Sequence, residues 1–218
     1  TEAVATGFGS RLPIRLLHEP YPGKSNALNH AVREATGDYL LFTDDDVLVD
    51  HDWLTAYVEA FRKWPDAAVF GGPIRPWFEG TPPEWLTRTF HCIEYAFAAL
   101  DLGEEPRRFA GHDVPFGANM AMRGAEQKRN LYDPSLGPRP GSGLRGEEIT
   151  LVKGMLAQGA DGWWVPDAVV RHFIPSHRQR LAYVREWYRG WGEYLAQSSP
   201  KGDGRSLFGR PLWLWREV

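Results

Sequence analysis

The sequence predicts an α/β fold in which helices flank a mixed, mostly parallel central sheet. No linker is evident, so residues 1–218 are expected to form one domain. Helix-like and strand-like patterns alternate between residues 25 and 70. Residues 39–42, YLLF, form a continuous apolar run, which is typical of a strand covered on both faces. Apolar residues make up 43% of the chain, which is enough for a sizeable core and excludes an intrinsically disordered protein.

The first half of the chain carries five predicted elements. Ser25 or Asn26 can cap the first helix, whose apolar residues recur with the 3.6-residue period until Gly37. Asp50 can cap the second helix, which stops before Pro65. The elements are a strand, a helix, a strand, a helix and a strand, at residues 14–17, 26–36, 39–42, 51–64 and 67–70. This order indicates parallel pairing of the strands.

The second half adds three helices and three strands. Thr81, Pro82 and Glu84 have the spacing of a capping box with proline at the first helical position. Residues 137–143, GPRPGSG, are expected to form a mobile loop, and a C-terminal helical tail is expected at about 179–218. The helices are predicted at 82–100, 147–158 and 179–197, and the strands at 116–122, 163–165 and 168–173.

Charge and cysteine content narrow the classes of function. With 25 Lys and Arg against 28 Asp and Glu, the net charge of -3 gives no electrostatic reason to expect nucleic acid as a partner. Cys92 is the single cysteine, which excludes a disulfide within the chain, and no Cys/His spacing suits a structural zinc site. The expected location is cytoplasmic, and Trp and Leu beside Arg210 and Arg216 permit peripheral contact with the inner face of a membrane.

Three consecutive aspartates, Asp44, Asp45 and Asp46, follow the predicted strand at 39–42 after a single threonine. In open α/β sheets, ligands bind at the carboxyl ends of strands. Carboxylates this close repel one another unless a cation offsets their charge, and their hard oxygens favour Mg²⁺ or Mn²⁺. Because Asp44 and Asp46 can share a face of an extended segment, the pattern predicts a divalent metal site. The structural alternative is a solvated turn in which an aspartate caps a helix.

Two further candidates follow much later in the chain. Glu147 and Glu148 lie at a predicted helix N-terminus, where a general base could face the metal site. The helix dipole also stabilises carboxylates there by roughly 0.3–1 kcal/mol, which is a purely structural reason for them. His172 lies in a predicted strand and could turn inward as a metal ligand, although a lone histidine in an apolar strand is more often a core residue.

Together these features resemble the inverting glycosyltransferases of family 2, which have the GT-A fold. The resemblance covers nearly the whole chain in the family's order and spacing. Four stretches carry it: GKSNALNHAVREATGDYLLFTDDD (23–46), PFGANMAMRG (115–124), GEEITL (146–151) and VPDAVVRHFIPSHR (165–178).

The resemblance implies a metal centre and a catalytic base. The triple aspartate corresponds to the family's DXD element, so Asp46 would bind the metal directly and Asp44 would lie near the donor ribose or the metal. His172 matches a histidine that completes the metal site in some relatives. Glu148 takes the place of the catalytic aspartate, with Glu147 as the reserve candidate. Donor-binding positions are implied for Lys24, Asn26, Asp38, Asp44, Asp45 and Asn119.

The implied reaction moves a sugar from a nucleotide diphosphate sugar to an acceptor hydroxyl, with inversion at the anomeric carbon. Mn²⁺ or Mg²⁺ would be the cofactor, and the acceptor would be a carbohydrate or a lipid-linked carrier. Two alternatives remain open: a nucleotidyltransferase or phosphotransferase that uses the same aspartates, and a non-catalytic carbohydrate-binding fragment.

The N-terminus departs from the family. Its members normally begin with a strand, a helix and a segment similar to Val-Asp-Asp-Gly-Ser, which holds the nucleotide base. Nothing of that kind precedes Ile14, so we expect an N-terminally incomplete GT-A domain whose sheet exposes an unpaired edge.

Overall fold

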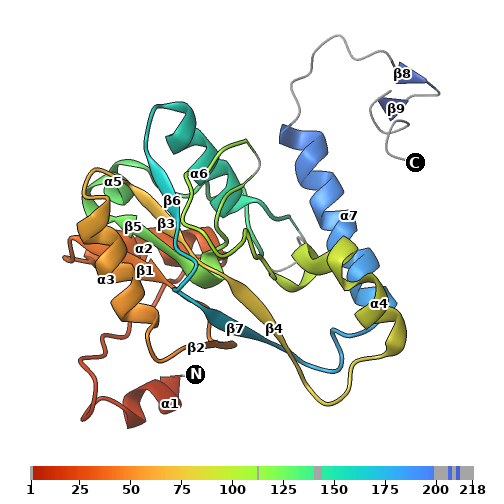
Figure 1. The fold of residues 1–218 in the computed structure, drawn as a ribbon, viewed down its shortest axis with the longest axis horizontal. Helices are drawn as coiled ribbons and strands as arrows, with labels where there is room; N and C mark the ends of the chain where they lie inside the picture. Colours follow the sequence, from red (N-terminus) through yellow and green to blue (C-terminus); the bar gives the residue numbers. More distant parts are fainter. Residues whose placement is uncertain (1, 112, 140–143, 199–205, 208–209, 212–218) are drawn as a thin grey trace.

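The computed structural model describes residues 2–111, 113–139, 144–198, 206–207 and 210–211 (Figure 1). The α-helices are α1 (Glu2–Gly7), α2 (Lys24–Glu34), α3 (Trp53–Lys63), α4 (Glu84–Ile93), α5 (Gly124–Arg129), α6 (Glu147–Ala157) and α7 (Leu181–Ser198). The 3-10 helices are η1 (Glu94–Phe97) and η2 (Gly117–Asn119). The strands are β1 (Tyr39–Phe42), β2 (Val47–Val49), β3 (Val69–Gly71), β4 (Ile74–Phe78), β5 (Met120–Arg123), β6 (Gly162–Trp164), β7 (Val170–Ile174), β8 (Ser206–Leu207) and β9 (Arg210–Pro211).

The central sheet has the strand order β1-β5-β3-β6 and is mixed. β5 lies between β1 and β3 and pairs antiparallel with both, with Met120 opposite Phe42 on one side and Gly71 on the other. β3 pairs parallel with β6. The α/β class is confirmed, but the expected direct parallel pairing of β1 with β3 is wrong because β5 separates them.

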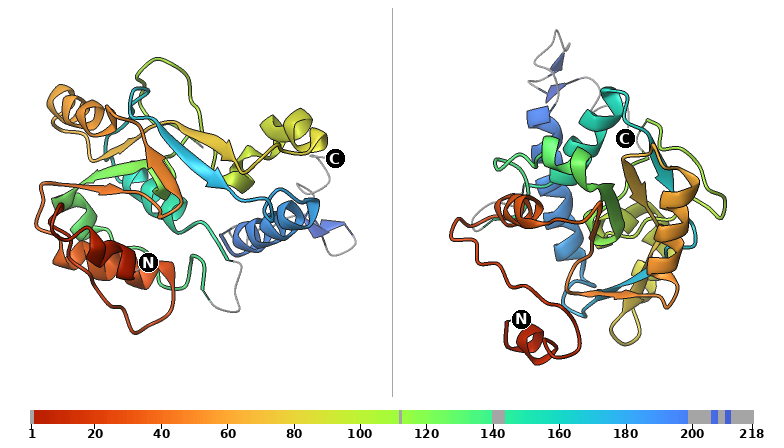
Figure 2. Two further views of the ribbon diagram at one scale, coloured as in Figure 1. Left: turned by 90° about the horizontal axis from the view of Figure 1, so that it is seen from below. Right: turned by 90° about the vertical axis from the view of Figure 1, so that its left-hand side faces the viewer.

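Helices cover both faces of this sheet. Successive side chains of a strand point to opposite faces, so Met120 and Met122 of β5 pack in one buried cluster with Val152 of α6. Ala121, which lies between them, packs in another cluster with Tyr57 of α3. Figure 2 shows α3 on one side of the sheet and α2 and α6 on the other. The sheet is therefore a rigid layer from which the loops at the ends of its strands project.

A second sheet, ordered β2-β7-β4, extends the structure toward α4 and α7 (Figure 1). β2 follows the triple aspartate and pairs antiparallel with β7, with Val47 opposite His172. At the end of β7, Ile174 packs in a buried cluster with Phe97 of η1 and Val184 of α7. The pairing of β2 with β7 therefore brings β7, η1 and α7, which are distant in the sequence, close to the carboxyl end of β1.

The N-terminal region differs from the prediction. Residues 14–17 form no strand, and Ile14 and Leu16 are 40% and 50% exposed. A strand needs a partner, and β1, at the edge of the central sheet, pairs with β5 alone among the described residues. The unpaired edge expected from the family pattern is therefore present in the described part of the chain.

Two other predicted features are wrong. α4 begins at Glu84 with Pro83 before it and no side-chain cap, so the capping box expected from Thr81 does not form. The helical tail expected at about 179–218 is confirmed over α7 but is wrong after it, where the described residues pair as β8 and β9. Among the described residues, no helix has the length and apolar character needed to cross a membrane.

Candidate active site

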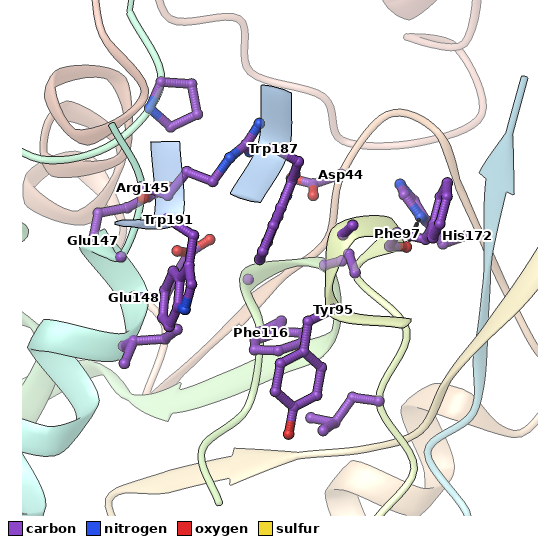
Figure 3. A pocket seen from close by; sticks show the side chains of 18 of the residues that line it. Asp44, Tyr95, Phe97, Phe116, Arg145, Glu147, Glu148, His172, Trp187 and Trp191 are labelled. Atoms are coloured by element: carbon purple, nitrogen blue, oxygen red, sulfur yellow. Dashed lines mark hydrogen bonds between the residues drawn. The ribbon is translucent and has the colours of Figure 1, made fainter. Parts of the chain in front are cut away.

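A cavity of about 760 Å³ brings the predicted acidic groups together (Figure 3). Asp44, Asp45 and Asp46 line it from the loop after β1, and Glu147 and Glu148 line it from the first turn of α6. The remaining lining comes mainly from η1, the segment around η2, β7 and α7. The two acidic groups, about 100 residues apart in the sequence, therefore share one solvent-accessible space.

Asp46 lies between a histidine and an arginine. The Nε2 atom of His172 is 3.3 Å from Oδ1 of Asp46, and Nη1 of Arg178 donates to Oδ2 at 3.0 Å. The Nδ1 atom of His172 lies 2.7 Å from the Phe97 carbonyl oxygen, to which it can only donate. In a neutral imidazole this bond leaves the Nε2 lone pair directed at the carboxylate.

This donor set fits a divalent metal ion. When the imidazole is neutral, as a metal ligand must be, its nitrogen and the facing carboxylate oxygen are two acceptors, and a cation between them relieves the repulsion. Two ligands at about 2.1 Å from one ion and at right angles stand about 3 Å apart, close to the observed separation. Among the described residues, no three His, Cys, Asp or Glu side chains gather to form a complete protein site. Mg²⁺-type sites often have one or two protein ligands and take the others from substrate phosphates and water.

Lys24, the first residue of α2, joins the acidic groups. Its Nζ atom donates to Oε1 of Glu148 at 2.8 Å and lies 3.5 Å from Glu147 and 3.9 Å from Asp44. Burial alone would lower the pKa of Lys24, but Glu148, Asp44 and Glu147 outweigh it and hold this pKa above its usual value. Lys24 is therefore a permanent cation within the cavity.

The adjacent glutamates titrate in opposite directions. Burial and the charge of Glu148 raise the pKa of Glu147 to about 7, against the opposing effect of Lys24. Burial alone would also raise the pKa of Glu148, but the ion pair and hydrogen bond with Lys24 hold it below its usual range. Glu148 is thus ionised at neutral pH, whereas Glu147 is partly protonated. Glu148 is also the more accessible, with a side chain 15% exposed against 3% for Glu147.

Two glycines lie where a side chain would collide with α7 or with Glu148. Gly146, immediately before α6, has φ +93°, and a Cβ atom there would lie 2.5 Å from the ring of Tyr194 on α7. A Cβ atom on Gly117 would lie 2.8 Å from Oε1 of Glu148. A side chain at either position would therefore displace α7 or the glutamate.

One wall of the cavity is aromatic. Tyr183, Trp187 and Trp191 recur every four residues along α7, so they share a helix face, and all three line the cavity. The Trp187 and Trp191 rings stack with centroids 5.9 Å apart, and the Arg145 guanidinium lies 5.2 Å from the Trp187 centroid. Figure 3 shows the Trp191 indole beside Glu148 and the Trp187 indole between Trp191 and Asp44 in the view, above Phe116 and Tyr95. Half-buried aromatic rings next to carboxylates suit an amphipathic ligand.

The structure does not bring every predicted residue to this cavity. Asn119 is fully buried and uses both ends of its amide, because Oδ1 accepts from Trp53 and Tyr57 and Nδ2 donates to the carbonyls of Pro73 and Ala168. Asn26 donates to the Pro22 carbonyl, and Asp38 is exposed; neither lines the cavity. The donor-binding roles expected for these three side chains thus find no support in their positions.

Among the other cavity residues, the sequence suggested a role for the aromatic residues of the last helix, which could stack on sugar faces although buried core was the likelier interpretation, but none for Arg178. Arg178 ends a stretch that resembles the family, yet only the pairing of β2 with β7 places it beside Asp46. The four-residue spacing of the aromatic residues in α7 was a detectable signal. Arg145 and Lys153 also line the cavity. Of the predicted loop at 137–143, Pro138 lines the cavity, and residues 140–143 lie outside the described part of the chain.

Residues 1–124, more than half of the chain, match the profile of glycosyl transferase family 2. The chain belongs to this family. It is 30% identical over 187 residues to the succinoglycan biosynthesis protein ExoM of Rhizobium meliloti, covering 84% of this chain and 55% of that protein. It is 28% identical over 182 residues to an N-acetylglucosaminyltransferase of Azorhizobium caulinodans, covering 77% of this chain and 43% of that protein. The chain therefore spans about half the length of these relatives.

The fold also has a solved counterpart. A mannosyltransferase from Pyrobaculum calidifontis, solved with GDP-Man and Mn²⁺, superposes with a TM-score of 0.60 at 18% identity, over 93% of this chain and 52% of that one. At this identity the likeness establishes the fold alone. The GT-A fold implied by the family resemblance is thus confirmed.

Proposed function

We propose that this family 2 chain catalyses metal-dependent, inverting transfer of a sugar from a nucleoside diphosphate sugar to a hydroxyl group of a carbohydrate. The observation that carries the proposal is the shared cavity, in which the Asp46–His172 pair and the Glu148–Lys24 pair both face one space. A phosphate-binding cation and a base are the two functional groups that direct displacement of a diphosphate requires. The mannosyltransferase with the same fold was solved with GDP-Man and Mn²⁺.

Asp46 and His172 would hold the divalent ion, Mn²⁺ or Mg²⁺, with Asp44 close by. When bound, this ion would neutralise the negative charge that develops on the departing diphosphate. The chain's own contribution is to fix the ligands: the Phe97 carbonyl orients His172, and the β2–β7 pairing sets Asp46 against it.

Glu148 would act as the base. Its ionised carboxylate removes the proton from the acceptor hydroxyl while the acceptor oxygen forms a bond to the anomeric carbon and the bond from that carbon to the diphosphate breaks. The acceptor approaches from the side opposite the leaving group, so the configuration inverts. Lys24 keeps Glu148 ionised in the free site. Glu147 is the less accessible base, because only 3% of its side chain is exposed against 15% for Glu148.

The aromatic wall supports a carbohydrate acceptor, free or lipid-linked. The apolar faces of pyranose rings pack on indole rings, and their hydroxyl groups can reach nearby charged groups. Trp187 and Trp191 both line the cavity, and Figure 3 shows Trp191 beside Glu148. A sugar held against α7 would present a hydroxyl group to the base.

The test is product analysis with UDP- and GDP-sugars, Mn²⁺ and a panel of oligosaccharide acceptors. We expect release of nucleoside diphosphate and an inverted anomeric configuration by NMR. Asp46→Asn and Glu148→Gln should each abolish transfer, while the exposed Glu105→Gln variant should retain it. Pyrophosphate release would instead indicate nucleotidyl transfer. A complete lack of nucleotide binding with Mn²⁺ would indicate a non-catalytic carbohydrate-binding fragment.

A further inference from the structure

Arg178 forms an ion pair with Asp46, the carboxylate to which the proposed function assigns the metal. Its Nη1 atom donates to Oδ2 of Asp46 at 3.0 Å, while Oδ1 of Asp46 lies 3.3 Å from Nε2 of His172. One oxygen of Asp46 is therefore bonded to Arg178, and the other faces His172. The side chain of Arg178 is 33% exposed and lines the cavity, so it has room to move within the same space.

The backbone that carries Arg178 is well anchored. Gln179, which is 5% exposed, donates to the carbonyls of Glu79 and Ile174, and the Arg178 amide donates to the Pro175 carbonyl. The segment between β7 and α7 is thus tied to the loop after β4. Only the long, flexible side chain of Arg178 is left to change position.

A guanidinium and a divalent ion compete for the same carboxylate. A divalent ion at Asp46 withdraws the negative charge that holds Arg178 and repels its guanidinium. A diphosphate offers an alternative partner within the cavity, because the planar fork of arginine matches pairs of phosphate oxygens. Movement from Asp46 to the diphosphate would keep Arg178 paired throughout.

We propose that Arg178 is an exchangeable counter-ion: it neutralises Asp46 until a divalent ion binds there, and it then pairs with the diphosphate of the donor. This inference rests on the proposed function. It makes the binding of metal and of diphosphate mutually favourable, because the diphosphate stabilises the guanidinium that the metal displaces. Arg178 is on this account a donor-binding residue that also limits metal binding in the absence of the nucleotide.

The test measures binding and does not depend on turnover. Mn²⁺ binding to the full chain is titrated by electron paramagnetic resonance, without nucleotide, for the wild type, Arg178→Met and Arg178→Lys. Arg171→Met is the matched control, because Arg171 also lies near a carboxylate, 3.6 Å from Asp50, yet does not line the cavity. Arg178→Met removes a cation next to the metal ligand, so it should bind Mn²⁺ about tenfold more tightly than the wild type. Arg178→Lys and Arg171→Met should bind Mn²⁺ as the wild type does.

UDP and GDP binding is then measured by calorimetry at saturating Mn²⁺. We expect about tenfold weaker binding in Arg178→Met and an intermediate loss in Arg178→Lys, because lysine keeps the charge without the fork. Unchanged or weaker Mn²⁺ binding in Arg178→Met would overturn the inference, and so would unchanged nucleotide affinity. If sugar transfer persists in that case, the proposed function survives and only the role of Arg178 is lost. A wild type that binds no Mn²⁺ would overturn both the inference and the metal dependence of the proposed function.

Discussion

Replacement of Glu147 by Gln should flatten the pH dependence of the protein's stability. The raised pKa of Glu147, about 7 against an ordinary value of 4.5, means that the folded protein keeps a proton that the unfolded chain releases. Between these two pH values the folded state binds more protons, so the free energy of unfolding falls as the pH rises. At about 1.4 kcal/mol per pKa unit, the contribution of Glu147 is about 3 kcal/mol.

The neighbouring glutamate does not obscure this effect. The pKa of Glu148 is lowered, so the stability it contributes is present above its unfolded pKa of 4.5 and is lost only as the pH falls below that value. The difference between the wild type and Glu147→Gln in their change of stability from about pH 5 to pH 8 therefore reports on Glu147, because groups common to both proteins cancel. Each protein is compared with itself at the two pH values, which cancels the fixed cost of the substitution.

The assay is urea unfolding followed by tryptophan fluorescence at both pH values. From about pH 5 to pH 8, the free energy of unfolding should fall by about 3 kcal/mol more in the wild type than in Glu147→Gln. Glu105→Gln, an exposed control, should lose as much as the wild type. If Glu147→Gln kept the pH dependence of the wild type, Glu147 would not be the group that holds the extra proton.

Three further predictions concern the framework and the acceptor wall. Gly146→Ala should destabilise the protein by about 2–4 kcal/mol in urea unfolding, because it combines a positive φ with a close contact to Tyr194. Stability equal to that of the wild type would mean that α7 can shift away from residue 146 at little cost. Asn119→Ala should cost about 3–5 kcal/mol by the same measurement, since four polar partners, three of them buried, lose their bonds. A loss below about 1 kcal/mol would contradict this role. Trp187→Ala should raise KM for an oligosaccharide acceptor about tenfold, while acceptor-independent hydrolysis of the donor stays constant. If transfer and hydrolysis fell by the same factor, Trp187 would contact the donor instead.

The sequence predicted the site better than the sheet. The acidic residues after β1 and at the start of α6 stood out because both follow local rules, the strand end and the helix N-terminus. Their shared cavity was expected from the family resemblance. The position of β5 was not predictable in the same way, because it enters between β1 and β3 from about 80 residues further along the chain. Long-range pairing of this kind leaves no local periodicity.

Side-chain direction was the other limit. Asn119 lies in a stretch that matches the family, but its amide turns toward Trp53 and Tyr57 on α3 and not toward the cavity. Conversely, Arg178 had no assigned role until the β2–β7 register placed it near Asp46. In both cases the sequence located the segment, and packing against a distant element decided the side chain's partners.

The charge balance of the cavity links these observations. Among the described residues, its lining contains five acidic side chains, Asp44, Asp45, Asp46, Glu147 and Glu148, and four basic ones, Lys24, Arg145, Lys153 and Arg178. A diphosphate donor adds about two negative charges to this nearly neutral set, which would be costly in a partly enclosed space. A divalent ion that enters with the donor restores the original balance. Because an ion at Oδ1 of Asp46 would withdraw the negative charge that holds Arg178 on Oδ2, release of the arginine toward the diphosphate would pair its charge with the added phosphate.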